Sequence, residues 1–225
     1  MTIQEIYTIL GARSRRKRLQ LLVPLLIHGV DTSLVDVGGT PEFWLRAGRM
    51  AHVTIVNISR PAIADQLPSW MECRLATGTA LPYADDSFDV AFSNSAIEHL
   101  GSLAAQRSFA TEIARVGRSY FVQTPSMAFP VEPHYLTPFV HWLPKRVRRR
   151  LVRRFTIWAW ITHPAQGYVD RMVDEIRLLT RTELSALFPG AGILTERFWC
   201  WPKSLIAIKR SDHVYPPCQD DVRRS

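Results

Sequence analysis

Four short apolar runs constrain the fold of this chain more than any other feature. Each is nearly unbroken in apolar character and rich in β-branched or aromatic residues: "SLVDVG" (33–38), "HVTIVNI" (52–58), "FDVAFS" (88–93) and "YFVQTP" (120–125). Strands that are covered on both faces of a parallel sheet have this pattern. Segments with helical spacing lie between the runs, namely "PEFWLRAG", residues 60–67 and residues 102–117. The alternation of strand and helix predicts an α/β fold with a doubly wound sheet.

The segments on either side of these runs extend the same pattern. Residues 3–28 have helical spacing, and "ECRLA" (72–76) is a weaker strand. "TRTE" (180–183) has the spacing of a capping box at the start of a helix. "GILTERFWC" and "SLIAIKR" predict two closing strands near the carboxyl end.

About forty residues after Pro125 follow neither the strand period nor the helix period. They are rich in proline, histidine and aromatic residues and continue into an arginine run. A segment of this length inside a compact domain is typical of a lid or a binding element. We therefore expect a helical segment at residues 1–30, a main domain at 31–210 with a lid-like insertion at 126–166, and a frayed tail at 211–225.

The positive charge of the chain is concentrated in two runs. The formal net charge is +8, and "RSRRKR" (13–18) and "KRVRRRLVRR" (145–154) hold 5 and 7 basic residues with no acids. Without these twelve residues the rest of the chain has a net charge of −4. The body is therefore mildly acidic, with two segments that could meet phosphates or anionic lipid head groups.

The cysteine and hydropathy patterns indicate a cytoplasmic protein. Cys73, Cys200 and Cys218 are widely spaced, with no CxxC pair and no histidine at zinc-like intervals, so neither a disulfide framework nor a metal site is expected. No apolar stretch approaches the ~18 residues that a membrane helix needs. "SRRKRL" is similar to a twin-arginine export signal, but no small-residue cleavage site follows it.

The stretch "LVDVGGTPEFW" (34–44) ends the first strand with an acid and two glycines. Ligands of open parallel sheets bind at the carboxyl ends of the strands. A ligand can approach the backbone of Gly38 and Gly39 closely because neither has a Cβ atom. A purely structural turn explains the same residues, so the glycines alone do not identify a site.

Together with "ATGTALPYADDSFDVAFSNSAIEHL" (76–100), this stretch resembles the class I S-adenosylmethionine-dependent methyltransferases, in particular the type 11 branch. That family has a glycine loop after its first strand, a polar residue ending the second, a "GDAxxLPFxxxSFD" stretch and "SxxxxH" after the fourth. The similarity runs from Leu34 to Pro125, and the order of elements extends it to Arg210. It implies a mostly parallel, seven-stranded Rossmann-like sheet with helices on both faces and an antiparallel edge strand.

The resemblance also implies a cofactor, S-adenosylmethionine, and the residues around it. They are Asp36, Gly38, Gly39 and Thr40 beside the methionine part, Asn57 at the ribose, Thr77 and Gly78 at the adenine, and Ser93 near the sulfonium. Three of these positions depart from the family pattern, because Thr40 replaces a third glycine and Asn57 and Thr77 replace acids. A charge-assisted hydrogen bond contributes about 1.5–3 kcal/mol and a neutral one about 1 kcal/mol. Weaker cofactor binding, or an inactive member of the family, is therefore an open alternative.

Three histidines are candidate catalytic residues. The cofactor brings its own reactivity, so the protein mainly aligns the acceptor and excludes water. A hydroxyl acceptor needs a base, and His99 is the first candidate because it follows the fourth strand. Capping and packing by Glu98 and His99 is the alternative. His134 and His141 in the insertion could close over the acceptor, or could be packed side chains of the insertion.

The run "HWLPKRVRRRLVRRFTIWAW" (141–160) combines arginines with tryptophans, as helices on anionic membrane surfaces do. A solvated basic helix with a packed aromatic underside is the alternative. The leading hypothesis is a methyltransferase for a small-molecule or lipid-like substrate, acting at oxygen, located in the cytoplasm or at the inner face of the membrane through residues 145–154. The other hypotheses are a nucleic-acid methyltransferase, which lacks an "NPPY" or paired-cysteine signature here, and a non-catalytic cofactor-binding interaction protein.

Overall fold

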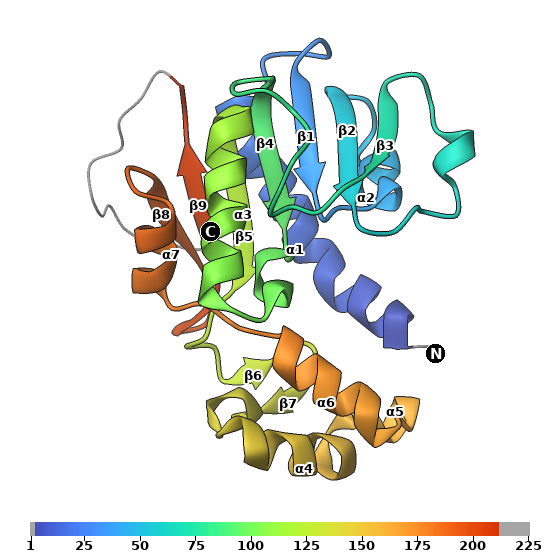
Figure 1. Cartoon of the computed structure of the whole chain (residues 1–225), viewed down its shortest axis with the longest axis vertical. Coiled ribbons are helices and arrows are strands. Elements are labelled where there is room, and N and C mark those ends of the chain that lie inside the picture. Colours follow the sequence, from blue (N-terminus) through green and yellow to red (C-terminus); the bar gives the residue numbers. More distant parts are fainter. Residues whose placement is uncertain (1–2, 212–225) are drawn as a thin grey trace.

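The computed structural model describes residues 3–211, with side chains from Ser14 onward. A seven-stranded sheet forms its centre, in the order β3-β2-β1-β4-β5-β9-β8 (Figure 1). The strands are β1 (Ser33–Val37), β2 (His52–Asn57), β3 (Met71–Leu75), β4 (Phe88–Asn94), β5 (Gly117–Pro125), β8 (Gly192–Phe198) and β9 (Trp201–Lys209). Strands β1 to β5 are parallel, and β9 runs antiparallel to both β5 and the outermost strand β8. The predicted mostly parallel sheet with an antiparallel strand at one edge is confirmed.

Helices cover both faces of this sheet (Figure 1). Helices α1 (Ile3–Leu26) and α2 (Pro41–Ala47) pack on one face, and α3 (Leu103–Val116) and α7 (Arg181–Leu187) on the other. Successive strand residues alternate between the faces, so Val35 and Val37 join the core under α3, whereas Leu34 joins the core under α1. All three are at most 1% exposed. Burial on both faces explains the unbroken apolar runs of the sequence.

The predicted helix at residues 60–67 is wrong. The chain there makes only a short 3-10 turn, η1 (Ala64–Gln66). Pro61 and Pro68 bracket this segment and leave too little chain for an α-helix, since proline favours extended backbone in the residue before it. The predicted capping box is confirmed, because Thr180 Oγ1 accepts from the Glu183 N–H at 3.2 Å and the Thr180 N–H donates to Glu183 Oε2 at 2.9 Å.

The insertion lies across the carboxyl ends of the strands and is mostly regular structure (Figure 1). It contains the hairpin of β6 (Val131–Glu132) and β7 (Thr137–Pro138), the turn η3 (Val140–Trp142) and helices α4 (Lys145–Phe155), α5 (Ile157–Thr162) and α6 (Gln166–Glu175). Helices α4 and α5 agree with the helix that both interpretations of residues 141–160 require. Helix α4 carries seven basic residues and buries only Val152.

The insertion has an apolar core of its own. That core joins Tyr135, Val152, Trp158, Val169 and Val173, each at most 5% exposed. Val169 and Val173 of this core belong to α6, which begins at the last residue of the predicted insertion (126–166). A separate core lets the insertion hold its own shape while it rests on the sheet edge. The tail predicted at 211–225 lies, from residue 212, outside the described residues.

A buried arginine attaches α1 to the sheet. Arg18 is 6% exposed, and its Nη1 donates to Asn94 Oδ1 and Gln123 Oε1, both at 2.7 Å. Its Nη2 lies 2.8 Å from Glu196 Oε2. The last residue of the first basic run is therefore a structural residue that joins α1 to β4, β5 and β8. Between residues 3 and 211, no helix is both long and apolar enough to cross a membrane.

We predict that Arg18→Met lowers the free energy of unfolding by about 3 kcal/mol, because it leaves the acceptors of Asn94, Gln123 and Glu196 without their shared donor. Arg16→Met is the matched control, since Arg16 is exposed on the same helix, and should change the stability by less than about 0.5 kcal/mol. Urea unfolding followed by circular dichroism measures both. Equal stability of the two variants would contradict the structural role of Arg18.

Candidate active site

The turn after β1 lies at the carboxyl end of the strands, the end of the sheet that faces the insertion (Figure 1). Gly38 has a φ of +83°, which favours glycine, and its N–H donates to Val56 O at 2.8 Å. A Cβ on Gly38 would lie 2.5 Å from the Cβ of Ala96. The glycine is therefore required by the backbone of the turn and by close packing against the segment after β4. The residue itself remains exposed.

Asp36 lies beneath this turn and is 1% exposed. Its Oδ2 accepts a 2.7 Å hydrogen bond from Trp44 Nε1, whereas its Oδ1 has no partner among the described residues. A Cβ on Gly39 would lie 1.8 Å from Oδ2, so the carboxylate occupies the space that Gly39 leaves open. Burial raises the pKa of Asp36 to about 7, although the hydrogen bond from Trp44 opposes the shift.

The other predicted cofactor residues fall into two groups. Thr40 and Thr77 are exposed beside the sheet edge, and Gly78 packs against Phe109 of α3. Asn57 and Ser93 instead hold the strand ends together. Asn57 Nδ2 donates to Gly39 O at 3.0 Å, and the fully buried Ser93 Oγ donates to Val37 O at 2.9 Å. Both side chains therefore shape the turn from within.

Ile58 also lies at this end of the sheet, although it is not among the cofactor residues predicted from the sequence. It follows Asn57 directly and is 81% exposed, an unusual position for a large apolar side chain at the end of a buried strand. The sequence could have indicated this exposed apolar residue, since the apolar run continues past the polar Asn57 into the turn.

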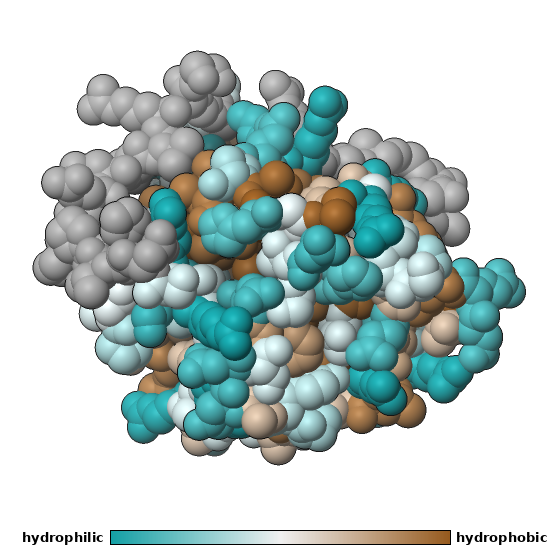
Figure 2. Space-filling model, turned by 90° about the horizontal axis from the view of Figure 1, so that it is seen from above, coloured by the Kyte–Doolittle hydropathy of each residue, from teal (hydrophilic) through white to brown (hydrophobic). Residues whose placement is uncertain are grey.

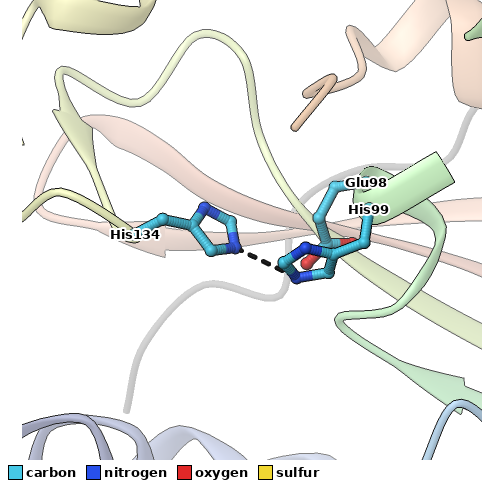
Figure 3. A group of neighbouring side chains, drawn as sticks. All are labelled: Glu98, His99 and His134. Carbon is cyan, nitrogen blue, oxygen red and sulfur yellow. Dashed lines mark hydrogen bonds between the residues drawn. The ribbon is translucent and has the colours of Figure 1, made fainter. Parts of the chain in front are cut away.

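Two of the three predicted histidines meet at the carboxyl end of β4. His99 lies on η2 (Ile97–Leu100), and His134 lies in the turn between β6 and β7. Their Nε2 atoms are 3.3 Å apart, and their rings are nearly perpendicular (Figure 3). His134 Nδ1 lies 2.7 Å from Oε1 of the buried Glu132. This contact places the hydrogen of neutral His134 on Nδ1 and leaves Nε2 as the acceptor nitrogen.

The two imidazoles differ in basicity. Burial of the ring and, to a smaller extent, the neighbouring His134 lower the pKa of His99 to about 4, although part of the residue is exposed. Burial also disfavours charge on His134, but the carboxylates of Glu132 and Glu98 outweigh it and raise the pKa of His134. His134 is therefore the stronger base of the pair, whereas the sequence analysis placed His99 first.

Glu98 is a site residue that the sequence analysis considered only for helix capping. It is fully buried, and its Oε2 accepts from Thr124 Oγ1 at 3.0 Å. Its Oε1 has no hydrogen-bond partner within the described part of the chain. Burial raises the pKa of Glu98, and the charge of His134 is the largest opposing effect. The sequence does not predict a role for Glu98 in the site, because its neighbour His134 comes 36 residues later, in the insertion.

His141 does not join this group. It lies on η3, is 4% exposed, and its Nε2 is 3.2 Å from Met127 O. Burial lowers its pKa. Its hydrogen bond fixes the insertion internally, so the geometry favours His99 and His134 over His141 as groups that face a ligand.

Residues 35–120 match the model of a family described as "Methyltransferase domain". These residues include the turn after β1, the end of β2, and β4 with η2. A search of curated proteins finds no match to the chain.

Solved structures match the fold at low sequence identity. The [4+2]-cyclase SpnF has 16% identity and a TM-score of 0.51, with 79% of this chain and 57% of that chain covered. A structure of Burkholderia thailandensis 1,6-didemethyltoxoflavin-N1-methyltransferase with S-adenosylhomocysteine has 12% identity and a TM-score of 0.50, with 87% and 76% covered. This chain thus spans less than two thirds of the cyclase. Because one is a cyclase and the other a methyltransferase, the shared fold does not identify a reaction.

The buried carboxylate predicts a pH dependence of stability. Because the folded-state pKa of Asp36 is raised from 3.8 to about 7, the folded chain keeps a proton that the unfolded chain has lost between those pH values. The free energy of unfolding therefore falls as the pH rises through this window, by on the order of 4 kcal/mol at most. Asp36→Asn should remove this part of the dependence, because its amide oxygen can still accept from Trp44.

Melting temperatures from pH 4 to pH 8 measure the effect. The melting temperature of Asp36→Asn should improve relative to that of the unchanged protein as the pH rises. The exposed Asp31→Asn serves as control and should follow the unchanged protein. Parallel curves for all three proteins would contradict the raised pKa of Asp36.

Proposed function

We propose that this chain transfers a methyl group from S-adenosylmethionine to an oxygen of a small or lipid-like acceptor, because residues 35–120 match the methyltransferase domain model and the sheet around them has the class I, Rossmann-like arrangement. The observation that carries the proposal is the meeting of His99 and His134 beside the family segment. Here the insertion adds a hydrogen-bonded base, oriented by Glu132, to the edge where open parallel sheets bind ligands.

The residues at this edge fit the cofactor. The Oδ1 atom of Asp36 has no hydrogen-bond partner in the part of the chain that the structure describes, and it suits the ammonium group of the methionine part, through a water molecule because the carboxylate is covered by Gly39. The exposed backbone at Gly38 can bind the same part, and Asn57 holds the turn in place. Ile58 gives the adenine an apolar surface to cover. When bound, S-adenosylmethionine supplies an electrophilic methyl group on a sulfonium.

The histidine pair would handle the proton of the acceptor. A hydroxyl becomes a better nucleophile when a base removes its proton as the new bond forms. Glu132 orients His134 and stabilises its charged form, so Nε2 of His134 is suited to receive that proton. His99, neutral at pH 7, would donate a hydrogen bond and position the acceptor oxygen.

The outer surface of the insertion supports a lipid-like acceptor at an anionic membrane. A cavity of about 150 Å³ opens there between the β6–β7 hairpin and α4, lined mainly by apolar side chains, among them Pro138, Phe139, Leu143, Leu151 and Phe155. Phe155 and Trp160 are 63% and 61% exposed. Arg146, Arg150, Arg153 and Arg154 of α4 are also exposed. Apolar side chains among arginines suit a surface of anionic lipid.

The face at the opposite end of the molecule differs from this surface. Figure 2 shows that hydrophilic and hydrophobic residues are interspersed there over the part not covered by grey atoms. Scattered apolar residues of this kind are ordinary for a protein surface. A membrane would therefore meet the insertion, which also covers the proposed acceptor site.

The activity is tested by incubating the protein with methyl-labelled S-adenosylmethionine and fractions of a cell extract. We expect label in the lipid or small-molecule fraction. His134→Ala should reduce the rate at least about 100-fold, because it removes the base. The exposed His28→Ala is the control and should keep the full rate. Label only in nucleic acid, or tight cofactor binding by calorimetry without transfer, would replace this proposal with one of the two alternatives.

The membrane contact is tested by sedimentation with phosphatidylcholine vesicles that contain or lack phosphatidylglycerol. Each basic residue near such a surface contributes about 1 kcal/mol, so the double variant Arg150→Glu, Arg154→Glu should bind the anionic vesicles more than about tenfold less tightly. Arg107→Glu, on an exposed position of α3, changes the same kind of charge away from the insertion and should bind normally. Equal binding of the unchanged protein to both vesicles would reject the contact.

A further inference from the structure

Three side chains lie close enough together to bind one metal ion: those of Glu98, His99 and His134 (Figure 3). Each offers one ligand atom, and these atoms all lie within 4.8 Å of one another. Glu98 and His99 belong to η2, whereas His134 belongs to the insertion. The group therefore exists only when the insertion is folded against the end of β4.

The distance between the imidazoles suits a shared metal ion. Two nitrogens bound tetrahedrally to zinc at about 2.0–2.1 Å lie about 3.3 Å from each other. The Nε2 atoms of His99 and His134 are 3.3 Å apart. A hydrogen bond between the rings has the same length, so the separation by itself fits both arrangements.

The carboxyl group of Glu98 distinguishes a shared metal ion from a direct hydrogen bond between the two imidazoles. Glu98 is fully buried, and its Oε1 has no hydrogen-bond partner among residues 3–211. A hydrogen bond between the two histidines leaves this oxygen unsatisfied, which is unfavourable in a buried position. A cation held by all three residues would satisfy it and compensate the buried charge.

A second layer of contacts holds the three ligands in place. Glu132 accepts from Nδ1 of His134 at 2.7 Å, the carboxylate–histidine contact that commonly supports a metal-binding imidazole. The backbone N–H of Tyr135 fixes Glu132 at 2.7 Å, and Thr124 Oγ1 fixes the other oxygen of Glu98 at 3.0 Å. Such support is typical of built metal sites.

We propose that Glu98, His99 and His134 bind a divalent transition-metal ion, with Zn²⁺ as the best match. Two imidazoles and one carboxylate form a donor set that zinc uses in catalytic sites, whereas Mg²⁺ and Ca²⁺ prefer oxygen ligands alone. Three protein ligands leave a coordination position open. Sequence spacing indicated no metal because two of the ligands are adjacent and the third lies in a separate unit of the fold.

The open position would take the oxygen of the acceptor, a role that rests on the proposed function. A metal-bound hydroxyl would lose its proton to solvent water more easily, and the ion would hold the resulting oxygen in place. As that oxygen forms its bond to the methyl carbon, the C–S bond of the sulfonium would break and S-adenosylhomocysteine would leave. With the ion bound, both histidines are ligands, and this activation replaces proton transfer to His134. Glu98→Gln separates the two mechanisms, because it removes a metal ligand but keeps the contact between His134 and Glu132.

Metal binding is measured first without cofactor or acceptor. The full chain is treated with EDTA, titrated with Zn²⁺ against a chromophoric chelator, and analysed for bound zinc. We expect one tightly held Zn²⁺ per chain and a higher melting temperature with the metal. His99→Ala and His134→Ala should each weaken binding at least about 100-fold, and Glu132→Gln about 10- to 100-fold. His28→Ala is the control and should bind normally.

Replacement of Zn²⁺ by Co²⁺ provides a direct spectroscopic check. Visible d–d bands of a four-coordinate site should appear in the unchanged protein and in His28→Ala, and should be absent in Glu98→Gln. Binding of zinc without methyl transfer would support this site and reject the proposed function. Retention of stoichiometric zinc by the double variant His99→Ala, His134→Ala, or no stoichiometric zinc in the unchanged protein, would overturn the site.

Discussion

Burial of β1 and β4 on both faces is the constraint from which the rest of the structure follows. Residues Leu34–Val37 have no exposed face, so a polar side chain in these strands must find a partner inside the protein. Ser93 meets this requirement through the carbonyl of Val37, and Asp36 meets half of it through Trp44. Ligand chemistry is thereby confined to the ends of the strands, where the backbone turns and side chains become accessible.

The insertion contributes two side chains, Glu132 and His134, to the site at the carboxyl ends of the strands. Its separate core includes Tyr135 and Trp158, and it therefore helps to hold the β6–β7 hairpin in a defined position. The hairpin brings Glu132 and His134 to His99, so the titratable groups of the site come from two independently packed units. The same unit carries the exposed arginines and apolar cavity of α4 on its outer side. The proposed acceptor site and the proposed membrane contact would thus share one structural element.

Much of this architecture was predictable because local sequence periods reflect local burial. The strands, α3 and the capping box at Thr180 follow directly from such patterns. The helix predicted at residues 60–67 is wrong because apolar spacing takes no account of the two flanking prolines, whereas the basic run of α4 is helical, as both of its interpretations require. The position of Glu98 beside His134 depends on contacts between distant segments, which no local pattern records. The sequence shows that two glycines follow the first strand, but the side groups beside them, Asp36 and Ala96, are identified only by the three-dimensional structure.

The attachment of α1 by Arg18 has a consequence for how the chain reaches this state. Its partner Glu196 comes 178 residues later, so the first helix cannot complete its docking until nearly the whole sheet is available. Contacts of such long range slow folding, because loop closure must precede the gain in interaction energy. During synthesis the guanidinium would stay hydrated until β8 emerges from the ribosome. The first helix is thus secured by one of the last strands to be made, and closure of the domain is a late, chain-wide event.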